Sequence, residues 1–270
     1  MRINTNIASM NAQQISNNVN KEIGSSLEKL ASGHSINKAS DDAAGLAIAD
    51  NLRTQATSLN QGIKNANSGV AMIQMADKAL DEVSNLLDTM KAKAMQGANG
   101  DSSATGLASL KADLEAMSKN IDSIFSDTKY NDTNLLNTEH TFQTGELAAQ
   151  KVTVAASGLE SAGSLGSAIG TVALASAGDA TALMTAVDTA LDTLNTKRSA
   201  LGAGQLQLES SVRTNQVSVV SLQNAESVIR DTDYAAESAN FNKLNIVSQA
   251  GMYAISQANS SQQNIMKLLQ

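Results

Sequence analysis

Proline and large aromatic residues are almost absent from this sequence. Its 270 residues include no proline, no tryptophan, three phenylalanines and three tyrosines, whereas average usage would give about 13 prolines. Proline interrupts helices, and large aromatic side chains fill thick interiors. The apolar 42% of the chain is mostly Ala, Leu, Ile, Val and Met. This composition predicts long helices in thin layers, with little material for a deep core.

Cysteine, clustered basic residues and long apolar runs are also missing. The absence of cysteine excludes disulfides, a thiolate nucleophile and cysteine metal sites. A net charge of -7 without a basic cluster argues against a nucleic-acid partner. No apolar run approaches the roughly 18 residues that span a bilayer, and residues 1–6 do not resemble a secretory signal. By these rules alone we expect a cytoplasmic protein with no membrane partner.

Both ends of the sequence have the periodicity of amphipathic helices. Near the C-terminus, apolar and small residues alternate between steps of three and four, the 3.5-residue period of a coiled-coil seam. This seam comprises Leu244, Val247, Gly251, Ala254, Ala258, Ser261, Ile265 and Leu268, with Leu269 beside its end. The N-terminal stripe comprises Ile3, Ile7 and Met10 and, after a one-residue slip, Ile15, Val19, Ile23, Leu27 and Leu30. We expect both faces to bind partners.

Capping residues predict where the first helices begin and end. The first helix should cover residues 5–31 and end near Gly33, which can adopt a left-handed C-cap conformation. Ser40 is predicted to cap the second helix. Asp41 and Asp42 would then lie in its first turn, where the helix dipole favours negative charge.

The rest of the chain reads as further helices around one short β element. A 3.5-residue register runs over 59–94, broken only by Asp77, and a third helix is expected over 107–125. Strand character on both sides of a glycine-containing turn predicts one small hairpin near 141–154. Residues 157–178 are rich in Ala, Gly and Ser, which predicts a flexible connection at which the chain reverses. A polar-interrupted seam over 187–229 predicts a helix of about 50 residues, roughly 75 Å long.

These elements predict a mainly α fold, a long antiparallel helical bundle with both termini at one end. The middle of the C-terminal seam is small, with Gly251, Ala254, Ala258 and Ser261. Ordering one residue costs roughly 1.5 kcal/mol, and burying such small side chains returns well under that amount. Two terminal helices alone would be marginal, so we expect several copies of the chain to pack together.

Several sequence stretches resemble those of bacterial flagellin, the subunit of the flagellar filament. In the first half they are RINTN at 2–6, LASG at 30–33, INKASDDAAGLAIA at 36–49, and YN at 130–131 followed by LLN at 135–137. In the second half they are KRSALGA at 197–203 and ESVIRDTDYA at 226–235. Any one stretch would be weak, but their order and spacing together make the resemblance specific, and it covers nearly the whole chain.

The resemblance implies a structural subunit that polymerises into the filament. Residues 1–40 and 234–270 would form an inner coiled-coil layer, and residues 41–233 an outer helical rod. Family members are exported through the flagellar type III apparatus without a cleaved signal, so the implied location is extracellular. The implied partners are other copies of the chain, a secretion chaperone at the C-terminal segment, and the filament cap and hook-junction proteins.

The candidate self-assembly residues follow from the seams and from the flagellin-like stretches. They are Ile3, Ile7, Met10, Leu27, Leu30, Asp41, Asp42, Arg230, Leu244, Val247, Ala254, Ala258, Ile265, Leu268 and Leu269. Residues 89–96 depart from the Arg-x-Arg-Glu-Leu-Ala pattern of many relatives, because Thr89 and Lys93 replace an Arg and a Leu. With Asp113, these positions form an altered version of the region that the vertebrate flagellin receptor recognises.

No pattern in the sequence predicts catalysis, and we expect no enzyme, metal or cofactor. His34 and His140 are the only histidines and are far apart in the sequence, and no nucleophile, base and orienting group occur together. Two alternatives to flagellin remain. A hook-filament junction protein has similar terminal helices, although residues 41–42 and 230–234 favour flagellin. A coiled-coil signalling or adaptor protein would not need apolar seams at both ends.

Overall fold

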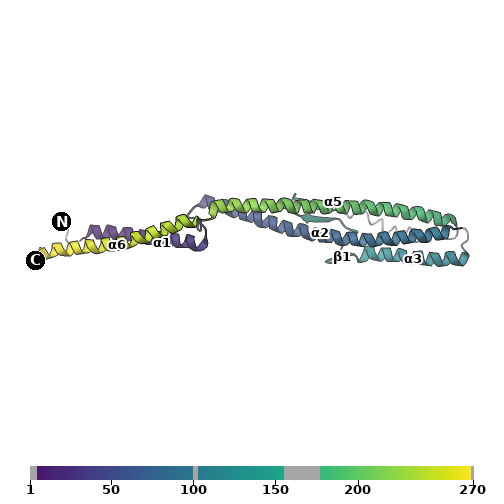
Figure 1. Cartoon of the computed structure of the whole chain (residues 1–270), viewed down its shortest axis with the longest axis horizontal. Helices are drawn as coiled ribbons and strands as arrows, with labels where there is room; N and C mark the ends of the chain where they lie inside the picture. The colour runs from purple at the N-terminus through teal and green to yellow at the C-terminus, as the bar shows by residue number, and fades with distance from the viewer. Residues whose placement is uncertain (1–4, 100–102, 155–176, 269–270) are drawn as a thin grey trace. The chain divides into compact units, whose positions relative to one another are not determined.

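The computed structural model describes residues 5–99, 103–154 and 177–268. Within these ranges it contains five α-helices and two small antiparallel hairpins, which confirms the mainly helical fold (Figure 1). The helices are α1 (Ile7–Ser32), α2 (Ala43–Ala98), α3 (Ala104–Asp127), α5 (Ala177–Arg230) and α6 (Tyr234–Leu268). The strands are β1 (Lys129–Tyr130), β2 (Thr133–Asn134), β3 (His140–Gln143) and β4 (Lys151–Val154). The predicted connection over 157–178 lies outside the described residues up to 176, and its last two residues belong to α5.

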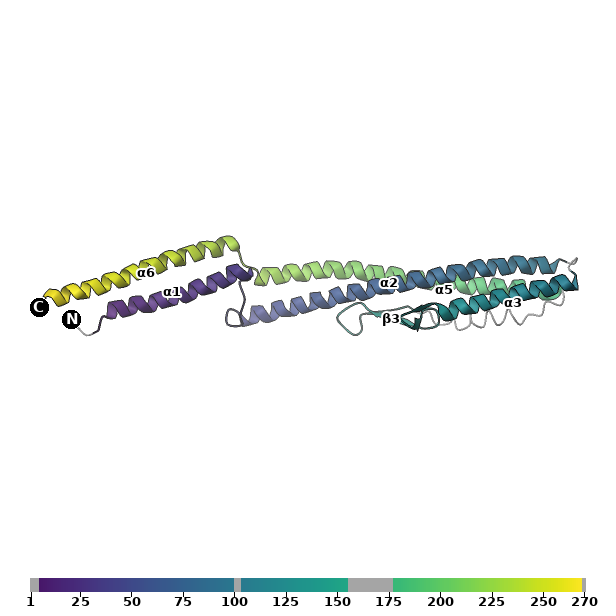
Figure 2. The same cartoon turned by 90° about the horizontal axis from the view of Figure 1, so that it is seen from below.

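The chain divides into two compact units. One comprises Met1–Thr54 with Ser221–Gln270, and the other comprises Gln55–Val220. The second unit, called here the central unit, holds the main apolar core. In it α3 runs beside α2, and α5 runs antiparallel to α2 (Figure 2). The ion pairs from Lys91 to Asp188 and from Asp77 to Arg198 show that the two helices are antiparallel, because the residue number rises along α2 as it falls along α5.

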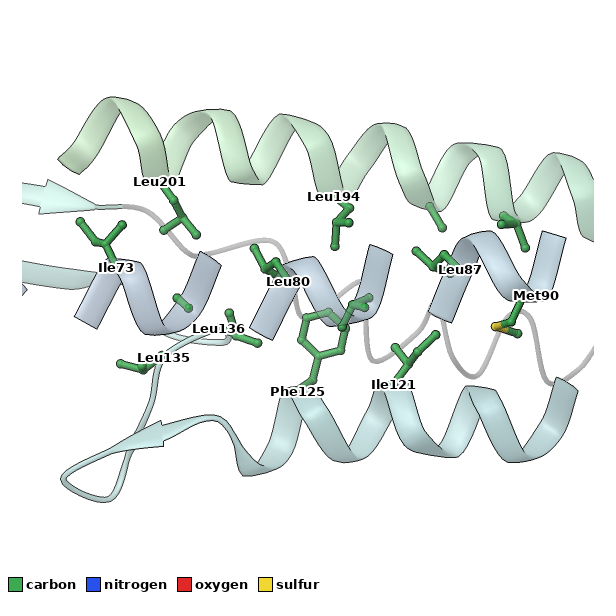
Figure 3. Packing of buried hydrophobic residues seen from close by; sticks show 14 of the residues in the cluster. Ile73, Leu80, Leu87, Met90, Ile121, Phe125, Leu135, Leu136, Leu194 and Leu201 are labelled. Atoms are coloured by element: carbon green, nitrogen blue, oxygen red, sulfur yellow. The ribbon is translucent and has the colours of Figure 1, made fainter. Parts of the chain in front are cut away.

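The core of the central unit is a seam between α2, α3 and α5, closed by residues that follow β2. Its largest side chains include Leu80, Leu87, Met90, Ile121, Phe125, Leu135, Leu136 and Leu194 (Figure 3). Buried positions on α2 follow steps of three and four from Ala66 to Ala94, as the 3.5-residue register predicts. The predicted break at Asp77 is wrong. Ala76 occupies that seam position and is buried, while Asp77 lies beside it and binds Arg198.

Ion pairs connect the helices along the edges of this core. The Arg198 guanidinium contacts Asp77 at 2.9 Å and Asp81 at 3.1 Å, and its hydrogen bond to Asp77 raises the arginine pKa. Lys93 on α2 binds Asp113 on α3 at 2.6 Å. These groups are partly exposed, so each pair contributes about 1 kcal/mol or less. By contrast, burial raises the pKa of Asp122, and its Oδ1 has no hydrogen-bond partner among the described residues.

The hairpin of β3 and β4 is antiparallel and lies where it was predicted, near 141–154. A second hairpin, β1–β2, was not predicted. Its two-residue turn consists of Asn131 and Asp132, both with positive φ, at 49° and 62°. Asn and Asp tolerate this conformation better than other non-glycine residues, and it is the conformation of a type I′ turn. The Asn-Asp pair was therefore the available sequence signal, although strands of two residues leave no alternation to detect.

The larger hairpin is seated tightly against α2 and α5. The side-chain amides of Asn65 and Asn215 donate to the carbonyl oxygens of Gln143 and Thr144, at 3.0 and 2.6 Å. Gly62 lies so close that a Cβ there would be 2.2 Å from the Thr144 carbonyl oxygen. Glycine at this position is therefore required by the close approach of two backbones.

Gly62→Ala is expected to destabilise the protein by about 1–3 kcal/mol, because the hairpin backbone must shift to admit the methyl group. The matched control is Gly202→Ala on α5, where nothing lies within 4 Å of the added Cβ. That change should stabilise by up to about 1 kcal/mol through helix propensity. Thermal unfolding of both variants checks the claim, and equal behaviour of the two would contradict it.

Candidate self-assembly surface

The terminal helices α1 and α6 lie side by side and run antiparallel (Figures 1 and 2). The Asn6 side-chain amide donates to the Ala258 carbonyl at 3.1 Å, and the Ser26 hydroxyl donates to Glu237 at the other end of the pair. Asn6 also caps α1, because its side chain accepts from the Ser9 amide. The predicted start near residue 5 and the stop at Gly33, with φ of 76°, are both confirmed.

The seam between α1 and α6 buries few side chains completely. Over residues 7–32 and 234–264, only Val19, Ser26 and Leu244 are buried. Gly251 and Ala258 are half-buried on the same face of α6, as predicted. Two helices of 26 and 35 residues joined by so little buried apolar surface contrast with the continuous core of the central unit.

The seam that the 3.5-residue period predicts on α6 is partly wrong. Val247, Ala254 and Ser261 are exposed, whereas Phe241, Ser248, Ile255 and Gln262 are half-buried. The two sets form neighbouring stripes one residue apart, and the stripe that contains Leu244 and Gly251 faces α1. The stripe with Val247 and Ala254 is therefore open to solvent in the single chain.

Large apolar side chains on other faces of the pair are also open to solvent. On α6, Ile246 is 67% exposed and Tyr253 is 75% exposed. They are seven residues apart and so share one face of the helix. The exposed set on α1 is Ile7, Met10, Ile15 and Leu27, and Leu30 is half-buried. Apolar surface spread around a helix pair, and not only along its seam, is typical of a surface that other chains cover.

A short two-strand bridge joins the segments at the base of this pair. The Ser35 amide donates to the Arg230 carbonyl at 2.7 Å, and the Thr232 amide donates to the Gly33 carbonyl at 3.0 Å. Beside them, His34 Nδ1 lies 3.2 Å from Asp231 Oδ1. The stretches that resemble flagellin near residues 33 and 230 are thus hydrogen-bonded to each other.

Asp41 and Asp42 have separate roles, and the prediction that Ser40 caps α2 is wrong. The Asp42 carboxylate accepts from the amides of Ala44 and Gly45 at 3.0 Å, so it is the capping group. The Asp41 carboxylate accepts from the amides of residues 37 and 38, and these bonds hold its pKa below the usual range. Ser40 lies in the turn that precedes α2, two residues before Asp42, and is too early to reach the first free amides of the helix.

Arg230 is an incompletely satisfied cation in this unit. Its side chain is only 16% exposed, and Nη1 lies 4.0 Å from both Asp50 and Glu226. Its Nε is buried without a hydrogen-bond partner among the described residues. Asp50 already binds Arg53 at 2.8 Å, so Arg230 is held by weak ion pairs.

The remaining candidate residues fall in three places. Ile265 and Leu268 belong to α6, and Ile3 and Leu269 lie outside the described residues. In the altered receptor region, Thr89 is exposed and its hydroxyl donates to the Asn85 carbonyl at 2.9 Å. Lys93 and Asp113 of that region form the ion pair between α2 and α3 described above.

Sites for other chemistry do not emerge in the described part of the chain. No group of three or more His, Asp or Glu side chains there could hold a metal ion. His34 and His140 lie in different units, the first beside Asp231 and the second beside Thr138. Across the same described ranges, no helix combines the length and hydropathy needed to cross a membrane.

Comparison with known proteins identifies the family. Residues 3–141 match the bacterial flagellin N-terminal helical region, and residues 184–269 match the bacterial flagellin C-terminal helical region. The chain is 34% identical to the flagellin of Bacillus subtilis (strain 168) and 32% identical to the flagellar filament 30.7 kDa core protein of Treponema maltophilum. Both alignments cover 100% of both chains.

A solved structure supports the same assignment. The crystal structure of Bacillus cereus flagellin has a TM-score of 0.50 and 26% identity, over 56% of this chain and 88% of that one. The resemblance to flagellin drawn from the order and spacing of the motifs is thus confirmed. The chain belongs to the bacterial flagellin family, whose members are the structural subunits of the extracellular flagellar filament.

Proposed function

We propose that α1 and α6 are the polymerisation module of this filament subunit. In this proposal residues 1–40 and 234–270 form the inner layer of the filament, and residues 41–233 form the outer layer. The observation that carries the proposal is the exposed apolar surface around the α1–α6 pair. A single chain leaves this surface in water, and burying it between copies returns about 25 cal/mol per Å² of apolar area.

Tyr253→Asp is expected to block seeded polymerisation, because it places a charge on an apolar face that neighbouring copies cover. The folded monomer should be unaffected, since the Tyr253 side chain is exposed in the single chain. Tyr253→Phe keeps the ring and serves as the matched control, and it should polymerise like the unmodified chain. Filament formation is measured by electron microscopy and sedimentation. Normal growth of the Asp variant would refute this role for α6.

The same exposed surface supports the proposed partners. Before export, a flagellar secretion chaperone would cover the apolar faces of the C-terminal segment, including Ile246 and Tyr253. At the filament ends, the cap and hook-junction proteins would contact terminal helices that lack one neighbouring copy. We also propose that the protein has no enzymatic activity, because its surfaces serve packing between subunits.

A further proposal concerns the altered receptor region at Thr89, Lys93 and Asp113. An Arg and an apolar anchor are the kinds of residue that dominate binding energy at interfaces. Here the first position is an exposed Thr, and the second is a Lys held by Asp113. We therefore expect this protein to activate the vertebrate flagellin receptor weakly. Its affinity for the receptor should be about 30- to 1000-fold lower than that of competent relatives.

The combined variant Thr89→Arg with Lys93→Leu should raise receptor activation. Both new residues are strong helix formers, so α2 should remain intact. The loss of the Lys93–Asp113 pair should lower stability by about 1 kcal/mol or less. A reporter-cell assay on purified monomer measures the response. Strong activation by the unmodified chain, equal to that of competent relatives, would overturn the proposal.

A further inference from the structure

The helix α5 has a second heptad register on its exposed side. Steps of three and four residues connect positions that are all exposed, away from the buried register that contains Leu201 and Leu208. We call these positions the outer seam of α5: Ala203, Leu206, Ser210, Arg213, Val217 and Val220. All of them lie in the central unit. Such spacing on a helix surface is the pattern that a second helix packs against.

Two features of this outer seam indicate a specific occupant. Leu206 is 66% exposed and Val220 is 56% exposed, so the seam carries large apolar groups at both ends. Between them, Arg213 forms no ion pair with any described residue. A matching helix therefore needs an apolar stripe with a carboxylate in it.

The exposed side of α2 offers such a carboxylate together with one large apolar group, Met75. Its exposed positions also follow steps of three and four, and we call them the outer seam of α2: Met75, Lys78, Glu82, Asn85, Thr89 and Ala92. Met75 is 45% exposed. Glu82 is an exposed acid that forms no ion pair within the described ranges.

Arg213 and Glu82 can lie opposite each other with the steps of both seams in phase only when the two helices run antiparallel, because a parallel pairing would set a step of three against a step of four on either side of them. Read forward along α5 and backward along α2, both have steps of 3, 4, 3, 4 and 3. The register that places Arg213 opposite Glu82 also places Val220 opposite Met75, because each lies seven residues further on. A shift of seven residues in either direction would instead place Arg213 opposite Met75 or Thr89, without a carboxylate.

Within one chain, α2 and α5 pack through their buried positions, and both outer seams are exposed. The two outer seams can therefore meet only between two copies of the chain. Within one chain α2 and α5 are antiparallel. Two copies in the same orientation therefore bring α5 of one beside α2 of the next in the required antiparallel sense. A contact between different surfaces of identical chains does not close on itself, and it generates open helical polymers.

We propose that the outer seam of α5 in one subunit packs against the outer seam of α2 in a second copy, with Arg213 paired to Glu82. This inference deepens the proposed filament function and rests on it. It adds to the terminal helices a contact made wholly by the central unit.

Charge exchange tests the pairing. Arg213→Glu and Glu82→Arg each place like charges opposite each other and should raise the critical concentration for seeded polymerisation at least about tenfold. The double variant restores opposite charges and should return to within about threefold of the unmodified chain. Lys119→Glu makes the same charge change on an exposed position of α3, outside both seams, and should polymerise normally. Circular dichroism checks that every monomer is folded.

The outcomes separate this inference from the function on which it rests. If the unmodified chain polymerises and either single variant does so equally well, the helix contact is refuted and the filament role stands. If both single variants fail and the double variant is not restored, the Arg213–Glu82 pairing is wrong. If the unmodified chain does not polymerise with seeds, the proposed polymerisation module falls, and this inference falls with it.

Discussion

Removal of residues 264–270 is expected to abolish polymerisation while leaving the central unit folded. The sequence places Ile265, Leu268 and Leu269 at the end of the terminal seam. In the structure, Asn6 at the start of α1 bonds to Ala258. Residues 264–268 of α6 therefore run beyond the described part of α1, and we expect the apolar residues at 265, 268 and 269 to contact other copies.

The expected effect is large because a polymer repeats each lost contact in every subunit. The truncated chain should remain monomeric under conditions in which the complete chain forms filaments. Its thermal unfolding should be unchanged, since the core from Ala66 to Leu208 does not include the deleted segment. A variant of full length with Gln at positions 265, 268 and 269 separates side-chain chemistry from chain length. Normal filaments from either protein would show that this segment is dispensable.

The second large effect is expected in hydrogen exchange. Amides around Ile7–Ile23 and Ile255–Ile265 should exchange readily in the monomer, because the α1–α6 pair buries too few side chains to offset its ordering entropy. Amides of Ile73–Ala94 in the core of the central unit should be strongly protected in the same sample. In filaments, protection of both terminal segments should rise to the level of the core. Strong terminal protection in the monomer would contradict the idea that polymerisation completes these helices.

Most of the helical architecture could be predicted because it follows from simple chain properties. Without proline, nothing interrupts a 3.5-residue pattern, and α2 and α5 follow theirs from end to end. Gly33 was predictable as a cap because it lies just past the predicted end of the first helix, and glycine readily adopts the positive φ that this cap has in the structure. The motifs near residues 33 and 230 identified the family, although only the structure shows that their backbones are hydrogen-bonded to each other.

The errors came from features that depend on three-dimensional contacts. The break at Asp77 was predicted because a small alanine beside it did not count as a seam residue, although Ala76 is fully buried. The α6 seam had two adjacent stripes of similar composition, and the position of α1 selects the stripe that contains Ser248. Likewise, the sequence marks Lys93 only as a departure from the family pattern, whereas the structure shows that Asp113 on α3 binds it.

A reconstruction of the filament tests the central claim most directly. The claim is that α1 and α6 of neighbouring copies cover one another and form the innermost layer. The predicted result is a map in which Ile246 and Tyr253 are buried between subunits and the central unit lies outside them. A map in which these side chains face solvent, or in which the α1–α6 pair lies on the outer surface, would contradict the account.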